Sequence, residues 1–322
     1  MKVLVTGGAG FIGSNLCRAL AAHPKFDRVI ALDDLSSGSM DNLTETETEL
    51  VIGSILDREV LTKLVAEADA VVHLAARPSV ARSVAAPLDS HEINVNGTLY
   101  VLEACRSAGA HVIVASSSSV YGAASAPVKD EALPTFPLSP YGASKLAAEA
   151  YALAYAASFG VDVLAFRFFN VYGPMQPAGH AYAAVVPAFV SAALSGESLH
   201  VHGDGRQSRD FTYVGTVVNV IVDALVRRLV SPSPVNLAYG TSVTVLELAH
   251  MVGRMVDRPV AIVNEPARVG DIRHSRAGND RLLELFPRNV PVPLEAGLER
   301  TVAWFRRTTA LLAEPVRSRT EN

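Results

Sequence analysis

Residues Thr6 to Gly13, which read T-G-G-A-G-F-I-G, constrain the fold more than any other stretch of this chain. An apolar run precedes them and an amphipathic pattern follows, so the segment predicts a buried strand, a tight turn and a helix. Gly7 permits the turn, Gly10 lets backbone N–H groups approach a pyrophosphate, and Gly13 lets the helix press against the strand. The loop indicates dinucleotide binding, although a glycine triplet alone also fits a turn without a ligand.

Asp33 strengthens the dinucleotide interpretation. It ends a second apolar run, Arg28 to Leu32, and lies 20 residues beyond Gly13. A carboxylate at this distance can accept hydrogen bonds from both ribose hydroxyls and would repel a 2′-phosphate, so NAD is favoured over NADP. The alternative role for Asp33 is a helix cap or turn residue, because Asp34 and a Ser-Ser-Gly sequence follow.

The composition describes a folded protein with no general attraction for polyanions. The chain has 322 residues, 49% of them hydrophobic and 19% charged, which suits one large or two ordinary domains. A net charge of −4 argues against nucleic acid or anionic lipid as a partner. The sequence shows no signal-peptide pattern and no run long enough to span a membrane, so we expect a cytoplasmic location. Cys17 and Cys105 lie in apolar helical patterns and are expected to pack, and no metal-ligand spacing is found.

Strand and helix patterns alternate through the first half of the chain. Apolar runs predict further strands at Leu50 to Ile52, Ala70 to Ala76 and His111 to Ala115, with helices at Arg58 to Ala68 and about Pro87 to Ala108. Strands this apolar, separated by helices, predict a doubly wound α/β fold with a parallel sheet covered on both faces, a Rossmann fold. Asp57 lies at one strand-to-helix turn, where it could accept from an adenine amino group or cap the following helix, and both roles are left open.

Tyr141 and Lys145 are the candidate catalytic pair. Ser139 and Pro140 predict the start of a helix that Gly160 ends, which places the two residues four apart on one helix face. An ammonium beside a phenol is expected to lower the pKa of Tyr141, so that it could take a proton from an alcohol. Four serines from Ser116 to Ser119 end the strand before this helix. An incidental surface pair is the alternative, but the preceding dinucleotide loop and serine-rich strand end favour catalysis.

The order of motifs resembles a known family. The segments are TGGAGFIG, Asp33, HLAA at 73–76, NVNGT at 94–98, SSSSVYG at 116–122 and YGASK at 141–145, and together they resemble the extended short-chain dehydrogenase/reductases through about Ala310. Three later segments are similar to those of nucleotide-sugar 4-epimerases: RFFNVYGP at 167–174, GDGRQSRDF at 203–211 and RVGDIRHS at 268–275.

The resemblance implies an NAD-dependent 4-epimerisation of a UDP-sugar, in which the alcohol at C4 is oxidised and then reduced on its other face. Ser117, Tyr141 and Lys145 would be catalytic. The implied cofactor contacts are Gly7, Gly10, Phe11, Ile12, Gly13, Asp33, Ile55, Asp57, Ala75, Asn94, Tyr141, Lys145 and Phe168. It also implies a homodimer that pairs through helices around Leu88 to Arg106 and Tyr141 to Phe159, whose outer faces are rich in alanine.

A nucleotide-sugar diphosphate needs an anchor, and the later segments contain suitable side chains. Asn170 can offer an amide, Arg209 and Arg268 can offer forked cations, and Asp271 can accept from ribose hydroxyls. The arginines could instead form structural ion pairs with Asp210 and Asp271. The implied substrate contacts are Ser79, Ser117, Ser118, Tyr141, Asn170, Val185, His200, Arg209, Arg268, Asp271 and Ser275.

The sequence leaves alternatives for the identity of the sugar and for the type of reaction. Ser275 matches a position that is small in 4-epimerases accepting N-acetylhexosamines, and residues 181–187 resemble the same group, whereas Pro78, His200 and His202 depart from it. Related dehydratases carry Asp-Glu where this chain has Ser118 and Ser119, which favours epimerisation over elimination. A dehydratase, a decarboxylase, a 4-ketoreductase, an epimerase of another nucleotide sugar such as UDP-glucuronate, and a redox-sensing NAD-binding protein remain the alternatives.

The domain organisation predicted from these patterns is discontinuous. Residues 1–172 with about 210–238 would form the NAD-binding domain, and about 173–209 with 239–310 the substrate domain. The stretch after Trp304 is expected to fray, with residues 311–322 as a tail.

Overall fold

A computed structural model describes residues 1–179, 183–257, 259–267 and 273–313, including the side chains up to residue 308. Its centre is a parallel sheet of seven strands in the order β12-β7-β5-β4-β1-β2-β3. The strands are β1 (Lys2–Thr6), β2 (Arg28–Asp33), β3 (Glu49–Ile52), β4 (Ala70–His73), β5 (His111–Ser117), β7 (Val163–Phe168) and β12 (Val235–Leu237). The predicted Rossmann fold is confirmed.

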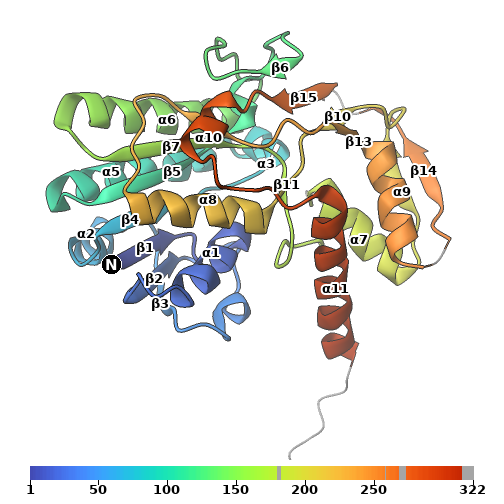
Figure 1. The fold of residues 1–322 in the computed structure, drawn as a ribbon, viewed down its shortest axis with the longest axis horizontal. Helices are drawn as coiled ribbons and strands as arrows, with labels where there is room; N and C mark the ends of the chain where they lie inside the picture. Colours follow the sequence, from blue (N-terminus) through green and yellow to red (C-terminus); the bar gives the residue numbers. More distant parts are fainter. Residues whose placement is uncertain (180–182, 258, 268–272, 314–322) are drawn as a thin grey trace, which may run out of the picture.

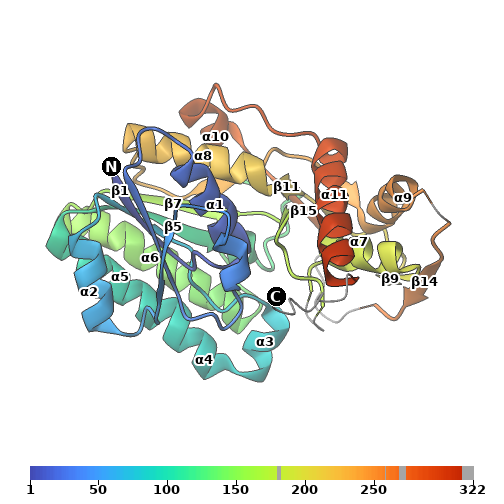
Figure 2. The ribbon, with the colours of Figure 1, turned by 90° about the horizontal axis from the view of Figure 1, so that it is seen from below.

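Helices cover both faces of this sheet (Figures 1 and 2). One face carries α1 (Phe11–Ala21), α8 (Val214–Arg227) and α10 (Asp280–Leu285), and the other carries α2 (Arg58–Ala66), α5 (Gly97–Ala108) and α6 (Pro140–Phe159). β1, β4 and β5 are buried almost throughout because each lies between two helical layers. Cys17 and Cys105 are buried in these layers as free thiols, as expected.

The helix predicted at about 87–108 is continuous but not uniform. It consists of α4 (Pro87–His91), a π-helical turn η2 (Glu92–Asn96) and α5. A π turn inserts one residue into the helical period, and such turns are frequent at functional sites. Here it contains Asn94, which is buried against the loop after β4. The short α3 (Val80–Ala85) precedes α4.

A second lobe lies beside the sheet, to the right in Figure 1. Its helices are α7 (Val185–Ser195), α9 (Val245–Met255) and α11 (Leu294–Ala313). Its strands are β6 (Val128–Lys129), β9 (Leu199–His202), β10 (Ser208–Arg209), β13 (Val243–Thr244), β14 (Ile262–Glu265) and β15 (His274–Ala277), in the sheets β13-β10-β15-β6 and β14-β9. β8 (Val171–Tyr172) and β11 (Thr212–Tyr213) pair where the chain passes between the lobes. The remaining short turns are η1 (Met40–Leu43) and η3 (Ser118–Val120).

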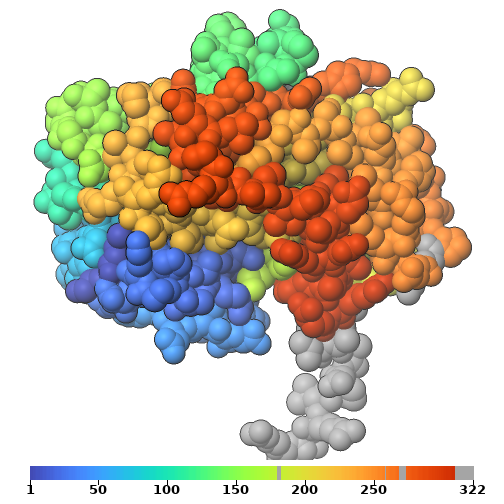
Figure 3. Space-filling view, viewed as in Figure 1, coloured from blue at the N-terminus to red at the C-terminus, as the bar shows by residue number. Residues whose placement is uncertain are grey.

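The chain enters the second lobe, returns to the sheet through α8 and β12, and then leaves it again. In the space-filling view, the segment with α10 and α11 runs across the front of the molecule from the sheet to the second lobe (Figure 3). α11 continues to Ala313, and the fraying expected after Trp304 stays a prediction. Among the described residues, no helix has the length and apolar character needed to cross a membrane.

Candidate active site

The glycine loop lies where the sheet changes direction. The chain winds from β1 outward through β2 and β3, then resumes on the other side of β1 with β4, so the ends of β1 and β4 form the crevice where such folds bind ligands. Gly7 has φ +72°, and a Cβ there would lie 2.8 Å from the backbone nitrogen of Ala75. A Cβ on Gly13 would lie 2.0 Å from the carbonyl oxygen of Gly7. Both positions therefore require glycine, for a close approach of one backbone to another.

Asp33 holds this loop in place. Its carboxylate accepts from the backbone N–H of Ala9 at 2.9 Å and from that of Leu35 at 2.8 Å. Burial raises the pKa of Asp33, and the two backbone donors oppose that rise. The residue also lines the main cavity, so the predicted ribose contact and a structural role in the turn are compatible.

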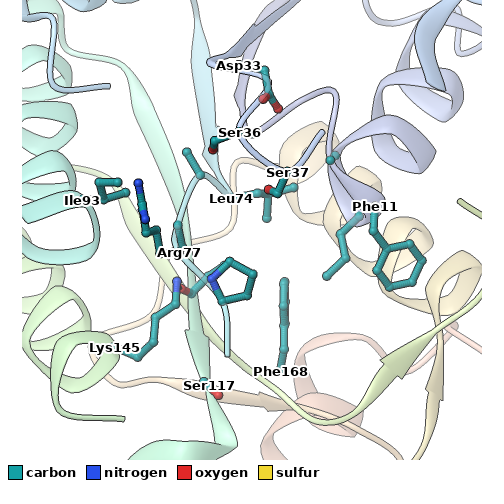
Figure 4. Close-up of a pocket in the computed structure, with 18 of the residues that line it drawn as sticks. Phe11, Asp33, Ser36, Ser37, Leu74, Arg77, Ile93, Ser117, Lys145 and Phe168 are labelled. Atoms are coloured by element: carbon teal, nitrogen blue, oxygen red, sulfur yellow. The ribbon is translucent and has the colours of Figure 1, made fainter. Parts of the chain in front are cut away.

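The main cavity, of about 410 Å³, follows the carboxyl ends of the strands from β2 to β7. Figure 4 shows Asp33 at one end and Ser117 and Lys145 at the other. The predicted residues that line it are Gly7, Gly10, Phe11, Ile12, Gly13, Asp33, Ile55, Ala75, Ser117, Ser118, Tyr141, Lys145, Phe168 and Asn170. The structure thus brings together residues from every part of the first half of the chain.

Asp57, Asn94 and Ser79 are predicted contacts that lie in the first lobe but do not line this cavity. Asp57 caps α2, because its Oδ1 accepts from the N–H groups of Glu59 and Val60, both at 3.1 Å. Its contact with adenine stays a prediction. Asn94 is buried behind the wall, where its Oδ1 accepts from the Arg77 N–H at 2.7 Å and its Nδ2 donates to Ser144 Oγ at 2.9 Å. Ser79 caps α3 and has φ +97°, an unfavourable conformation for serine.

Ser117, Tyr141 and Lys145 meet at the end of β5. Ser139 caps α6 through the Gly142 N–H at 3.1 Å and Gly160 ends the helix with φ +69°, as predicted. Ser117 lies near the Tyr141 hydroxyl, and its interaction with the phenol acts to lower the pKa of Tyr141. Lys145 Nζ donates to the carbonyl of Ala115 at 2.9 Å, and burial lowers its pKa to about 8.

The pKa of Tyr141 differs from the sequence expectation. Burial raises the pKa of Tyr141, and the nearby Ser117 opposes the rise. The predicted lowering of the Tyr141 pKa by Lys145 is therefore wrong, because removing the phenol from water destabilises the phenolate more than Ser117 stabilises it. An additional positive charge, brought by a ligand, would be needed to favour the phenolate.

A buried network of hydrogen bonds adjoins this triad. Glu149, two helical turns beyond Tyr141 on α6, accepts from Arg167 Nε at 2.9 Å and Nη2 at 2.7 Å and from Ser116 Oγ at 2.6 Å. Arg167 also lies over the ring of Tyr121, 4.7 Å from its centroid. The network ties the catalytic helix to β5 and β7 beside Ser117. Sequence reasoning missed it, since nothing in the spacing of Glu149 and Arg167 marks them as partners.

His73, the last residue of β4, also has a structural role. It is buried between β1 and α5, with Nδ1 2.7 Å from Thr6 Oγ1 and Nε2 2.9 Å from Thr98 Oγ1. Burial, with a smaller contribution from Lys145, lowers its pKa to about 3. It is therefore neutral at physiological pH, and its bonds explain the histidine of the HLAA motif as a link between strand and helix.

A second cavity, of about 340 Å³, lies in the second lobe and shares Asn170 with the first. Three predicted substrate contacts, Val185, His200 and Arg209, line it. So do Gln207 and Phe189, which the sequence analysis did not single out. Its rim is fixed by His200, whose Nδ1 is 2.8 Å from Glu265 Oε1.

The other predicted substrate residues either line neither cavity or lie outside the described residues. Ser275 is buried in β15, opposite Arg209 of β10, and lines neither cavity. Arg268 and Asp271 lie outside the described residues, as do residues 181 and 182 of the motif at 181–187. Asp210, the alternative ion-pair partner of Arg209, accepts from the N–H groups of Gly240 at 3.0 Å and Ala277 at 3.1 Å and from Thr241 Oγ1 at 3.0 Å.

A cavity that begins at a glycine loop and an acidic residue and ends at a Ser-Tyr-Lys group fits an extended dinucleotide with its reactive end beside Tyr141. Among the described residues, no group of histidine, cysteine and acidic side chains could hold a metal ion. The fold and the site together define a nicotinamide-dependent Rossmann enzyme of the short-chain dehydrogenase/reductase type. More specifically, residues 3–238 match the model of the NAD dependent epimerase/dehydratase family, and the chain belongs to it. NAD is its cofactor.

The similarity to individual members extends over nearly the whole chain. A UDP-glucose 4-epimerase of Mycolicibacterium smegmatis is 38% identical over 95% of this chain and 99% of its own length. A UDP-N-acetyl-alpha-D-glucosaminuronate decarboxylase of Bacillus cytotoxicus is 32% identical over 95% and 98%. A UDP-N-acetylglucosamine 4-epimerase from Methanobrevibacter ruminantium M1, solved with UDP-N-acetylmuramic acid, is 37% identical over 95% and 98%, with a TM-score of 0.89. The relatives therefore include enzymes named for different reactions.

Gly7→Ala tests whether the close approach of β1 and β4 holds the cofactor. The variant should lose bound NAD and unfold at a lower temperature, because its Cβ would displace the backbone of Ala75. Gly109→Ala is the matched control, because Gly109 also has a positive φ, +68°, but no atom lies within 4 Å of its Cβ position. This substitution should lower the free energy of unfolding by only about 1–2 kcal/mol, and the variant should keep its NAD. Nucleotide content after gel filtration measures the difference. Equal NAD content in the two variants would contradict this role for Gly7.

Proposed function

We propose that the protein is an isomerase that converts a UDP-sugar into its 4-epimer through a 4-keto intermediate. The observation that carries this proposal is that Asn170 lines both cavities. A ligand that fills the second cavity with its nucleotide can therefore reach Tyr141 with its sugar. Arg209, on the wall of the second cavity, supports a diphosphate between these two ends.

The reaction follows from the triad. Tyr141, as phenolate, takes the proton from O4, while Ser117 donates a hydrogen bond to the same oxygen and the Lys145 ammonium stabilises the phenolate. Bound NAD⁺ supplies a reversible hydride acceptor for C4 and a positive charge that favours the phenolate. The O4–H and C4–H bonds break and a C4=O double bond forms. After the 4-keto sugar has turned over, Tyr141 returns the proton to O4 as hydride reaches the opposite face of C4.

This cycle needs a firm hold on the nucleotide and a weak hold on the hexose, since a tightly held ring could not present both faces. The separate second cavity supports the first requirement. Ser118 and Ser119 line the main cavity where elimination of water would need an acid and a base, and hydroxyl groups have too high a pKa for those roles. Epimerisation is therefore favoured over dehydration. Decarboxylation is the second candidate, because several relatives are decarboxylases.

The substrate range we propose is UDP-glucose and UDP-galactose, together with UDP-GlcNAc and UDP-GalNAc on account of the small Ser275. Incubating the protein with UDP-GlcNAc or UDP-glucose, and reading the products by proton NMR, tests this directly. The 4-epimer should appear as the product. A 4-keto-6-deoxy sugar from either substrate, or a UDP-pentose formed from UDP-glucuronate in a parallel incubation, would overturn the epimerase proposal.

Ser275→Tyr tests the size argument. We expect kcat/KM for UDP-GlcNAc to fall by about tenfold or more, because a bulky residue at the matching position restricts related 4-epimerases to plain hexoses. Turnover of UDP-glucose in the same variant is the internal control for folding and should change much less. An equal loss for both sugars would sink the proposal that Ser275 sets the range of substrates.

We also propose a homodimer formed through α4, η2, α5 and α6, the helices around Leu88 to Arg106 and Tyr141 to Phe159. Leu88, Tyr151 and Phe159 are 82%, 43% and 55% exposed along these helices, and α6 contacts α4, η2 and α5. Exposed large apolar side chains on neighbouring helices favour burial against a second copy. We retain the discontinuous division as a proposal: 1–172 with 210–238 for NAD, and 173–209 with 239–310 for the substrate.

A further inference from the structure

The cavity that holds NAD contains a buried hydrogen-bond acceptor with no partner in the protein. Gln176 lines this cavity, and its Oε1 is buried without a hydrogen bond. Its Nε2 donates to the carbonyl of Val171 at 3.2 Å. Turning the amide over would set two carbonyl oxygens against each other, so the orientation of the side chain is determined. Buried acceptors are rarely left unpaired, and an exception within a ligand cavity calls for a donor from the ligand.

The position of Gln176 identifies which end of the cofactor it faces. Asp33, at the end of β2, marks the adenosine end of the cavity, whereas Ser117 and Phe168 end the neighbouring strands β5 and β7, paired in register. Gln176 is bonded to Val171, three residues beyond Phe168, and so belongs to the end with Tyr141 and Lys145. The reactive nicotinamide must lie there if Tyr141 is to act on the same substrate carbon.

The loop that carries Gln176 is fixed on its other side by α1. Asn15 Nδ2 donates to the Pro174 carbonyl at 3.0 Å, and Ser14 Oγ lies 3.1 Å from Met175 Sδ. The side chain is thus positioned before any ligand binds, which lowers the entropy cost of a new hydrogen bond.

We propose that Gln176 Oε1 accepts a hydrogen bond from the carboxamide NH₂ of the nicotinamide of NAD. The carboxamide is the one strong N–H donor at that end of the dinucleotide. A bond to it fixes the rotation of the nicotinamide ring and therefore the face that C4 of the ring presents to the substrate. Gln176 is a positioning contact for the cofactor, and it takes no part in proton transfer.

The test compares NAD with 3-acetylpyridine adenine dinucleotide, in which a methyl group replaces the carboxamide NH₂. The protein is dialysed against an equimolar mixture of the two until the bound composition is constant, and the bound nucleotides are then released and quantified by chromatography. In wild type the ratio of bound NAD to bound analogue should be about ten, because one hydrogen bond to an otherwise unpaired acceptor is worth about that factor in affinity. In Gln176→Leu this ratio should approach one.

Two further variants separate this role from general damage. Gln176→Glu keeps an acceptor and should keep a preference for NAD. Gln207→Leu changes the only other glutamine, which lines the second cavity, and should keep the wild-type ratio. Loosening of the fold would lower both bound nucleotides together and leave their ratio unchanged. Equal binding of the two nucleotides by wild type, or an unchanged preference in Gln176→Leu, would overturn the proposal whatever reaction the enzyme catalyses.

Discussion

Tyr141→Phe is expected to reduce turnover by roughly 10²–10⁴-fold, the usual contribution of a positioned acid–base group. The phenyl ring fills the same space, but no group remains that can take the O4 proton. Ser117 retains its contact with Ser119 Oγ at 3.2 Å, so the strand end should keep its conformation. NAD content and thermal stability should therefore stay close to those of the wild type.

Tyr239→Phe is the matched control for this variant. The Tyr239 hydroxyl is buried with no hydrogen-bond partner, and the residue lines neither cavity, so its removal should leave turnover unchanged. Initial rates with saturating UDP-sugar measure both variants. Turnover of Tyr141→Phe within a few-fold of wild type would contradict the role assigned to Tyr141.

Glu149→Leu should produce the largest loss of stability. The Glu149 and Arg167 side chains are only 4% and 5% exposed, and removal of the carboxylate would leave the guanidinium buried without a counter-charge. Breaking such a pair typically costs about 3–5 kcal/mol in the free energy of unfolding. The double variant Glu149→Leu/Arg167→Met should recover part of that loss, because it removes both charges.

Asp223→Asn provides the control for this cycle. It breaks the exposed pair of Asp223 and Arg227, whose side chains are 38% and 42% exposed, and should cost no more than about 1 kcal/mol. Denaturant unfolding of the four proteins gives the comparison. If Glu149→Leu were as mild as Asp223→Asn, or if the double variant were worse than the single one, the electrostatic account of the network would fail.

The features that the sequence predicted correctly are those set by local spacing. The glycine loop, Asp33 at the end of β2, and Tyr141 four residues before Lys145 each combine nearby residues whose geometry follows from strand, turn or helix periodicity. The parallel sheet was predictable for the same reason, because each apolar run alternates with a helical pattern.

The features that the sequence did not predict depend on contacts between distant segments or on burial. Glu149 and Arg167 come together only when α6 packs on β7, and Asn94 faces the loop at Arg77 only because of a π turn. The direction of the Tyr141 pKa shift depends on how far the phenol is removed from water, which spacing does not reveal. Gln176 differs again, since its partner is a ligand rather than another residue.

The most direct measurement of the central claim uses a UDP-sugar carrying deuterium at C4, incubated in ordinary water with no NAD added. If the protein oxidises and reduces C4 with a cofactor that it retains, the 4-epimer should form with its deuterium still at C4, as proton NMR and mass spectrometry would show. Loss of the deuterium to water, or a requirement for added NAD in proportion to product, would contradict oxidation and reduction within one active site.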